Sequence, residues 1–387
     1  MEMYGPETLS DHMVEWRRHL HQHPELSFEE KETSAYIAEK LKKLECFEVH
    51  EQVGGYGIVA VISNGEGPVV GVRADMDALP ITEQSSAGYA SVNEGVMHAC
   101  GHDAHCAILL GVAHWVKEHR ETITGTIKLI FQPAEETADE EGETGAEKMI
   151  RSPLLEDIDA IYALHMCPWL RTGEIQVNDG PSMANNDEFH ITIFGEGAHA
   201  GYPHQGADPI WMTTQFLQTV YSMTGRRMHP LEIGTISVGQ IHAGTASNII
   251  PDRVDIYGTM RSYTDQVRYQ LEKELLEKIN MIHSLGGQYQ WKIQKGEPAL
   301  INDEDLNEVV RKAAANFEIY NEPFGMGSED FSHMVNRLKG TMFFLGCGLE
   351  KERMLHQPDF DIDEQALQKG LDIMVGILQS YWKNQEG

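Results

Sequence analysis

The sequence predicts an α/β protein whose mainly parallel sheet domain carries an inserted ferredoxin-like α+β domain. Strand-like and helical segments alternate through the first part of the chain, which is typical of a parallel sheet covered by helices. From residue 183 to residue 295 the pattern changes to the order β-α-β-β-α-β, the ferredoxin-like unit. The first pattern then returns, so the sheet domain is expected to comprise residues 1–182 and 296–387.

Length and charge limit the classes of function. The chain has 387 residues, enough for two domains, and 60 acidic against 30 basic residues give a net charge of −30. Such an acidic surface disfavours nucleic acid and anionic membrane as partners. No apolar run is long enough to cross a bilayer, and the first residues lack the features of a secretory signal. Five scattered cysteines do not predict a disulfide framework, so a cytoplasmic location is expected.

Helices of the sheet domain are predicted where apolar residues recur at helical spacing. In the first helix, Met13, Trp16 and Leu20 share one face, and Pro24 ends the helix. The predicted helices are residues 9–23, 27–44, 106–119, 305–317 and 363–382.

Strands of the sheet domain are predicted from short β-branched runs bounded by turn residues, such as the glycine-rich turn at residues 64–67. The predicted strands are residues 57–63, 68–73, 126–131, 160–164 and 341–346. The acidic, glycine-containing segment 139–147 is predicted to be a mobile loop.

The inserted domain has clearer strand patterns. Phe189, Ile191 and Ile193 alternate on one face of its first strand. Its predicted strands are residues 187–195, 234–241, 252–262 and 288–294, and its predicted helices are 209–223 and 265–285.

Residues suited to metal binding follow four strand ends or turns in succession. Because the carboxyl ends of parallel strands meet at one edge of a sheet, these side chains are expected to gather there. Thiolate and imidazole ligands suit zinc, cobalt, nickel or manganese better than calcium or magnesium. For each group alone, the alternative is an ordinary polar surface loop. The groups are Asp75 with Asp77, Cys100 with His102, Glu135 with Glu136, and His165.

Two of these groups favour a division of roles. Neighbouring side chains point in different directions, so Glu135 and Glu136 suit one ligand and one free base. Asp75 and Asp77 are costly to bury unpaired, which favours one Asp that bridges or ligates a metal and one that orients a neighbouring base.

Eight motifs in order resemble one known family over nearly the whole chain. They are residues 73–80, 97–105, 131–136, 163–165, 197–201, 247–252, 327–331 and 355–358. The chain resembles the two-metal amidohydrolases, which include aminoacylases, hippurate-type hydrolases and auxin–amino-acid conjugate hydrolases. These enzymes are relatives of the co-catalytic zinc carboxypeptidases.

The resemblance implies two divalent metal ions, with zinc, manganese, cobalt and nickel left open, and it implies Glu135 as general base and acid. Asp75 or Asp77 orients the base, and the spacing favours Asp77. The implied metal ligands are Cys100, His102, Glu136, His165 and His356.

Further residues are candidates for contacting the substrate. His199 is a candidate donor to the oxyanion, in its own or a partner's site, and the alternative is a turn histidine satisfied by backbone. Asn248 and Arg261 are candidates for the substrate carboxylate, and Arg261 is alternatively a surface ion pair. Glu329, in a glycine-rich turn, is expected to shape the substrate pocket. The resemblance also implies a homodimer or tetramer.

The predicted reaction is hydrolysis of the amide bond of N-acyl amino acids, N-acetyl amino acids above all, or related conjugates. The alternatives are an N-acetyl-diaminopimelate deacetylase of lysine biosynthesis, a dipeptidase and a non-catalytic metal-binding scaffold. Glu135 beside Glu136 argues against a scaffold, because a pure binder needs no base. A serine hydrolase is disfavoured because no Gly-x-Ser-x-Gly motif is present.

Overall fold

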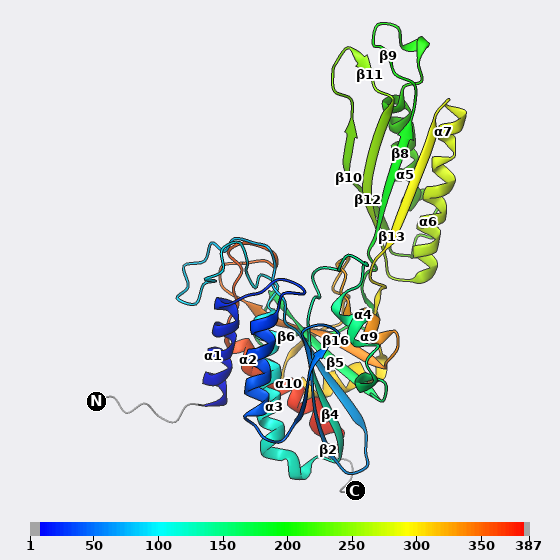
Figure 1. The fold of residues 1–387 in the computed structure, drawn as a ribbon. Coiled ribbons are helices and arrows are strands. Elements are labelled where there is room, and N and C mark those ends of the chain that lie inside the picture. Colours follow the sequence, from blue (N-terminus) through cyan, green and yellow to red (C-terminus); the bar gives the residue numbers. More distant parts are fainter. Residues whose placement is uncertain (1–7, 383–387) are drawn as a thin grey trace. The chain divides into compact units, whose positions relative to one another are not determined.

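The computed structural model describes residues 8–382, which form two compact units (Figure 1). Unit 1 takes in the described chain up to Ser182, then Ile301–Phe324 and the described chain from Asp330. Unit 2 takes in Met183–Leu300 and the separate segment Gly325–Glu329.

Unit 1 is built on an eight-stranded sheet of order β1-β2-β4-β3-β5-β16-β6-β15. The pairs β4-β3, β3-β5, β5-β16 and β6-β15 are parallel and the others antiparallel, which confirms the predicted α/β class with a mainly parallel sheet. The strands are β1 Glu48–Val53, β2 Gly57–Asn64, β3 Val69–Asp75, β4 Gly125–Gln132, β5 Ala160–Arg171, β6 Glu174–Gln176, β15 Glu318–Tyr320 and β16 Gly340–Gly348.

The strand predictions differ from the structure in two ways. The sequence patterns do not predict β1, β6 and β15, nor the short strands β7 Gly180–Met183 and β14 Leu300–Asn302, which pair with each other. β1 is charged and mostly exposed, and the other four strands are short. The strand predicted to end at residue 164 continues to Arg171, because β16 offers pairing partners as far as Gly348. His165 therefore lies within β5 and not after its end.

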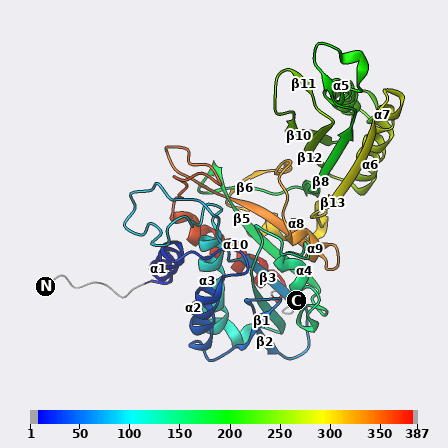
Figure 2. The same ribbon diagram turned by 45° about the horizontal axis from the view of Figure 1, so that its top comes forward.

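Helices cover both faces of the unit 1 sheet (Figures 1 and 2). On one face, α3 packs between α1 and α10, and buried residues such as Leu110, Phe131 and Ile377 fill the core beneath them. The short helices α4 and α9 lie on the other face. The helices are α1 Leu9–Gln22, α2 Lys31–Lys42, α3 His102–His119, α4 Gly145–Met149, α8 Glu304–Ala313, α9 Phe331–Val335 and α10 Gln365–Ser380.

The acidic segment predicted as a loop is partly helical. Asp139 accepts hydrogen bonds from the backbone N–H groups of Glu141 and Glu143. Thr144 then begins α4 with a capping box, so the loop prediction is wrong for residues 145–147.

Unit 2 has the predicted ferredoxin-like topology. Its antiparallel sheet has the order β10-β12-β8-β13, and α5 and α6 pack on one face around Phe216 and Leu271. The helix predicted over residues 265–285 is interrupted at Asn280, whose side chain donates to the carbonyl of Leu276. The elements are β8 Asp187–Phe194, α5 Pro209–Arg226, β10 Gly234–Ala243, β12 Arg253–Ser262, α6 Asp265–Ile279, α7 Met281–Ser284 and β13 Gln288–Lys295.

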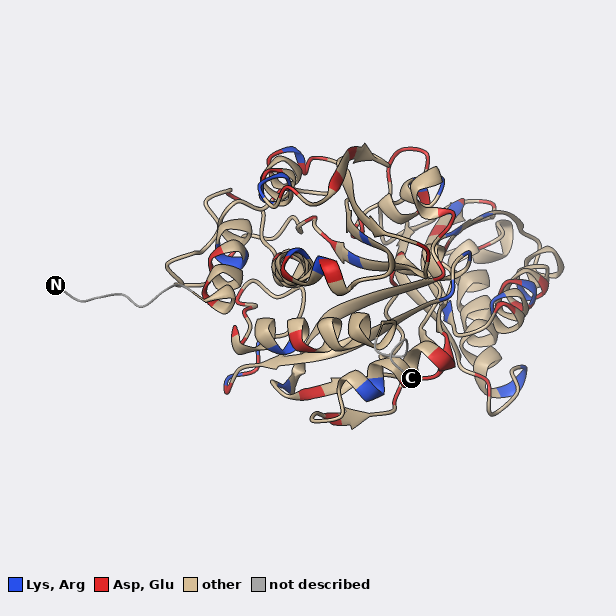
Figure 3. Cartoon of the chain, turned by 90° about the horizontal axis from the view of Figure 1, so that it is seen from below, with Lys and Arg blue, Asp and Glu red and all other residues tan. Residues whose placement is uncertain are grey.

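None of the helices in residues 8–382 is both long and apolar enough to cross a membrane. Charged residues are spread over the elements of both units (Figure 3).

A buried ionic network ties α1 to α3. Arg17 and Asp103 are both fully buried, with Nε of Arg17 2.8 Å from Oδ2 of Asp103. Nδ1 of His21 lies 2.8 Å from the same carboxylate oxygen, and Nη2 of Arg17 also reaches Asp361. Asp103 follows the predicted ligand His102, so this network anchors the first turn of α3.

The network predicts a loss of stability at alkaline pH. Burial alone lowers the pKa of His21, but the charge of Asp103 and its hydrogen bond raise it to about 9. The folded protein thus keeps a proton that the unfolded chain releases above about pH 6.5, so the stabilisation is complete below pH 6.5 and disappears as the pH rises to about 9. Deprotonation of His21 should therefore lower the free energy of unfolding by about 3 kcal/mol between pH 6.5 and about pH 9.

Urea unfolding at both ends of the interval measures this loss. His21→Asn should flatten the pH dependence, whereas substitution of the exposed His204 by Asn should leave it as in the wild type. An equally steep dependence in His21→Asn would contradict the assignment.

Candidate metal centre

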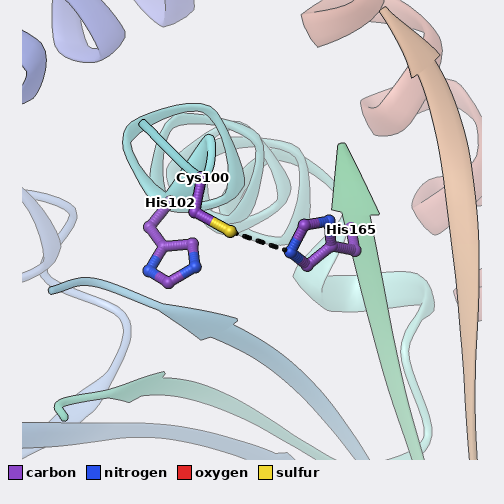
Figure 4. Close-up of side chains that lie close together, drawn as sticks. All are labelled: Cys100, His102 and His165. Carbon is purple, nitrogen blue, oxygen red and sulfur yellow. Dashed lines mark hydrogen bonds between the residues drawn. The ribbon is translucent and has the colours of Figure 1, made fainter. Parts of the chain in front are cut away.

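The five side chains predicted to bind metal converge in unit 1. Their ligand atoms form two overlapping groups, Cys100–His102–His165 and Cys100–Glu136–His356, each with all atoms within 4.8 Å of one another. Cys100 belongs to both groups. Its Sγ lies 3.4 Å from Nε2 of His165 (Figure 4) and 3.4 Å from Nε2 of His356. The five side chains would be able to hold two divalent cations, with the thiolate of Cys100 available to either group.

Two buried atoms support a cation at this place. Nε2 of His102 and Oε1 of Glu136 are buried and have no hydrogen-bond partner among the described residues. They lie 3.8 Å apart. Buried polar atoms without partners are rare, and a bound ion is one explanation for them. Thiolate, imidazole and carboxylate donors together suit a divalent transition metal.

Gly101 allows Cys100 and His102 to face the same point. It has a left-handed backbone with φ of +92°, and a Cβ at this position would lie 2.9 Å from Cγ of Met166. Any larger residue would therefore clash in a conformation that already favours glycine. The turn ends at His102, the first residue of α3, four residues earlier than the predicted helix start.

Backbone carbonyls orient the imidazoles for metal binding. Nδ1 of His102 lies 2.9 Å from the carbonyl oxygen of Asp77, and Nδ1 of His165 lies 2.8 Å from that of Met166. Each Nδ1 therefore carries the proton and donates it, which leaves the Nε2 lone pair for a cation. Burial lowers the pKa of His165 to about 3, so its ring stays in the neutral form that binds metals.

A strained turn presents the two neighbouring glutamates. Ala134 has a φ of +47°, unusual for a residue with a side chain, and its N–H donates to Oε1 of Glu30 at 2.7 Å. The N–H of Glu136 donates to Oδ2 of Asp77 at 3.0 Å. These bonds hold the turn so that Glu135 and Glu136 each have a carboxylate oxygen within 4.8 Å of His102.

His356 enters the site from a loop that precedes α10. It also has a left-handed backbone, with φ of +60°, and its N–H donates to the carbonyl of Ala99 at 2.8 Å. This bond ties the loop to the segment that carries Cys100. The His356 side chain is more exposed than the other four and lies 3.6 Å from Oε1 of Glu136.

The donor set concentrates negative charge. Burial raises the pKa of the Cys100 thiol, and the carboxylates of Glu136 and Glu135 raise it further. Burial also raises the pKa of Glu136, against the opposing charge of His102. A bound divalent cation would lower both pKa values, because it stabilises the thiolate form of Cys100 and the carboxylate form of Glu136.

Asp77 and Asp75 have different surroundings. Asp77 accepts hydrogen bonds from Oγ of Ser27 at 2.7 Å and from the N–H of Glu136, and its Oδ1 lies 3.3 Å from Nδ1 of His102. Asp75 instead contacts Nη1 of Arg73 at 2.7 Å and Nδ1 of His105 at 2.6 Å. Asp77 thus contacts two of the proposed ligands, whereas Asp75 is engaged by a buried cation and a second histidine and lies farther from His102, with its Oδ2 3.7 Å from Nε2.

His105 is close to the metal site but has no free lone pair. Its Nδ1 faces Asp75, and its Nε2 accepts a hydrogen bond from the N–H of Met166 at 2.9 Å. We therefore interpret it as a structural residue, although its nitrogen lies within 4.8 Å of ligand atoms of Asp75 and His102.

Several residues that support the site were not among the predicted site residues. Most of them lie within the motifs named above, and those motifs could have pointed to them. Ser27 and Glu30 lie outside every motif, so no sequence pattern indicated their role. The missed residues are Ser27, Glu30, Arg73, His105, Gln132 and Asp330.

Unit 2 brings His199 and Asn248 together. Strand β9 (Ala198–His199) pairs with β11 (Ile249–Ile250), and the N–H of Ala200 donates to the carbonyl of Asn248 at 3.0 Å. Both residues are exposed. Nδ1 of His199 accepts from the N–H of Gly201 at 3.0 Å, which leaves Nε2 as the donor in the neutral ring.

The structure does not bring Arg261 to this pair within the chain. Arg261 lies near the end of β12, and its guanidinium contacts the side chain of Asn186. The pair of His199 and Asn248 lies beyond the other end of β12, the end that begins at Arg253. The eight residue steps from Arg253 to Arg261 span roughly 26 Å at about 3.3 Å each. Glu329 is buried in the segment Gly325–Glu329, and its role in a substrate pocket stays a prediction.

The α/β fold and a cluster of Cys, His and carboxylate donors beside a further glutamate are features of metal-dependent hydrolases. The profile of Peptidase family M20/M25/M40 matches residues 71–380, and the chain belongs to this family. It is therefore a metal-dependent hydrolase of the amidohydrolase type.

Several relatives are similar over most of their length. The chain is 39% identical to an N-acetyl-L-cysteine deacetylase from Bacillus subtilis over 94% of this chain and 86% of that one. It is 38% identical to an N-acyl-L-amino acid amidohydrolase from Geobacillus stearothermophilus, over 76% and 78%. The solved structure of Bacillus subtilis YXEP protein, a dinuclear metal-binding peptidase from the M20 family, superimposes with a TM-score of 0.85 at 31% identity, covering 97% of this chain and 99% of that chain.

Two variants test whether His102 is a metal ligand and His105 a structural residue. His102→Gln should lose bound metal on dialysis against a weak chelator, because the Nε2 lone pair is gone. His105→Gln should keep the wild-type metal content but lose about 1–3 kcal/mol of stability, because it disturbs the contacts with Asp75 and the Met166 N–H. Elemental analysis and thermal unfolding measure both effects, and metal loss in His105→Gln alone would overturn the assignment.

Proposed function

We propose that the protein hydrolyses the amide bond of N-acyl amino acids and holds two divalent ions for this reaction. The proposed ligands are Cys100, His102, Glu136, His165 and His356. The observation that carries the proposal is the convergence of these ligand atoms with Glu135 at one place in unit 1. The names of the relatives support the same class of substrate.

Glu135 is proposed to move the proton. When bound, the divalent ions lower the pKa of a water molecule and polarise the carbonyl oxygen of the substrate. The Glu135 carboxylate accepts the proton of the attacking water and delivers it to the leaving amine nitrogen. Glu135 is half-buried beside Glu136, so its carboxylate remains accessible while its neighbour serves as a ligand.

Asp77 is proposed to orient His102. Its carboxylate faces the protonated Nδ1 of His102 and accepts from the backbone of Glu136, so it fixes two ligands at once. His199 is proposed to donate to the oxyanion through Nε2, since the backbone contact of Nδ1 with Gly201 sets the tautomer.

A homodimer is proposed because one copy of unit 2 cannot offer all three of its candidate substrate residues to one site. Arg261 lies near one end of β12, and the His199–Asn248 pair, on the separate two-stranded sheet of β9 and β11, lies beyond the other end, much farther away than the length of an N-acyl amino acid. A site that uses Arg261 from one copy must therefore receive His199 and Asn248 from another. Isologous dimers provide such an exchange in both directions.

Removal of the proposed base tests the reaction. Glu135→Gln should retain metal but lower kcat by about 10²–10⁴-fold, because no carboxylate accepts the water proton. The exposed Glu141→Gln should keep wild-type rates. The assay uses metal-loaded enzyme with N-acetyl amino acids, hippurate, N-acetyl-diaminopimelate and a dipeptide.

The substrate panel separates the alternatives. Cleavage of N-acetyl-diaminopimelate alone would replace the proposed function by the biosynthetic deacetylase, and cleavage of the dipeptide alone by a dipeptidase. Metal-loaded wild type that cleaves none of the substrates would favour a non-catalytic scaffold.

Subunit mixing tests the shared site. Glu135→Gln and His199→Ala should each be inactive alone, whereas co-expression should restore roughly a quarter of wild-type activity, because half of randomly formed dimers are mixed and each holds one complete site. Differential affinity tags confirm that mixed dimers form. Mixed dimers without activity would place Glu135 and His199 of one site in the same subunit.

A further inference from the structure

We infer that a row of three aromatic rings beside His165 binds the acyl group of the substrate and favours flat, aromatic acyl groups over acetyl. This inference rests on the proposed function. We call the row of Phe344, Phe324 and Trp169 the aromatic shelf. All three residues belong to unit 1.

The shelf begins at a proposed metal ligand. Phe344 on β16 is the register partner of His165 on β5, and their ring centroids lie 6.1 Å apart. Phe324 stacks on Phe344 with centroids 4.2 Å apart and an interplanar angle of 27°, and it lies 6.2 Å from the ring of His165. An apolar surface therefore borders the site where the reacting carbonyl is proposed to bind.

The shelf continues from the site to solvent. The Trp169 ring centroid lies 5.0 Å from that of Phe324, and Trp169 is 41% exposed. Phe324 is half-buried and Phe344 is fully buried, so exposure increases along the row away from His165. An exposed tryptophan next to a second partly exposed ring offers a surface for stacking by a flat group.

The shelf is held in place before any ligand binds. The side-chain amide of the buried Gln176 donates to the carbonyls of Glu322 and Pro323, at 3.0 and 2.9 Å. These bonds fix the backbone directly before Phe324, and the stack on Phe344 fixes its ring. Binding to a preformed surface costs little ordering of the protein.

The charge at each end of the substrate indicates which end binds to the aromatic shelf. An N-acyl amino acid has a carboxylate at one end and the acyl group at the other. A carboxylate needs a cation or hydrogen-bond donors, which the apolar faces of the three rings do not offer. The acyl group is uncharged, so it suits the shelf.

The test compares N-benzoyl-glycine with N-acetyl-glycine, which differ only in the acyl group. In the wild type, kcat/KM should be higher for the benzoyl substrate. Trp169→Ala should lower the benzoyl-to-acetyl ratio of kcat/KM by about tenfold, and Trp169→Phe should restore most of it. Trp291→Ala, which removes an exposed tryptophan of unit 2, should keep the wild-type ratio.

A second readout does not depend on turnover. Benzoate should bind the metal-loaded protein more tightly than acetate in calorimetry, and Trp169→Ala should lose this difference. If the wild type cleaves no N-acyl amino acid but shows Trp169-dependent benzoate binding, the proposed function fails and the shelf remains a binding surface for aromatic carboxylates. An unchanged benzoyl-to-acetyl ratio in a folded Trp169→Ala variant, or equal losses for both substrates, would overturn the inference.

Discussion

The buried carboxylate of Asp77 is the interaction on which the site depends most. It joins Ser27 from the loop between α1 and α2, the backbone of Glu136 after β4, and the ring of His102 at the start of α3. A buried carboxylate without partners is costly, so the fold is stable only when all three segments meet it. Two of the three segments that hold this charge, those of Glu136 and His102, therefore also supply proposed ligands.

Local strain and rigid support occur together around the site. Ala134 and His356 both have left-handed backbones; Ala134 directly precedes the proposed base Glu135, and His356 is a proposed ligand. Such conformations persist only where surrounding contacts enforce them, here through Glu30 and the carbonyl of Ala99. The buried pair of Arg17 and Asp103 also fixes the first turn of α3.

Strands β5 and β16 connect the metal chemistry with substrate choice. Their parallel register places His165 beside Phe344, and four residues further along β5 the chain presents Trp169. The same pairing of two strands thus positions a proposed ligand and the surface proposed to bind the acyl group. A change of register would move both together.

The sequence alone determined the α/β class, the ferredoxin-like insertion and the residues that gather at the candidate metal centre. This was possible because hydrophobic periodicity and the order of the motifs are local properties of the chain. Tertiary structure alone decided which atoms have free lone pairs. His102 and His105 are three residues apart in one motif, yet only His105 has both nitrogens engaged, through contacts with Asp75 and Met166. The tertiary structure also placed His199 beyond the end of β12 that is opposite to Arg261, and it brought Phe324 to Trp169. Pairing between distant segments depends on packing that no local pattern records.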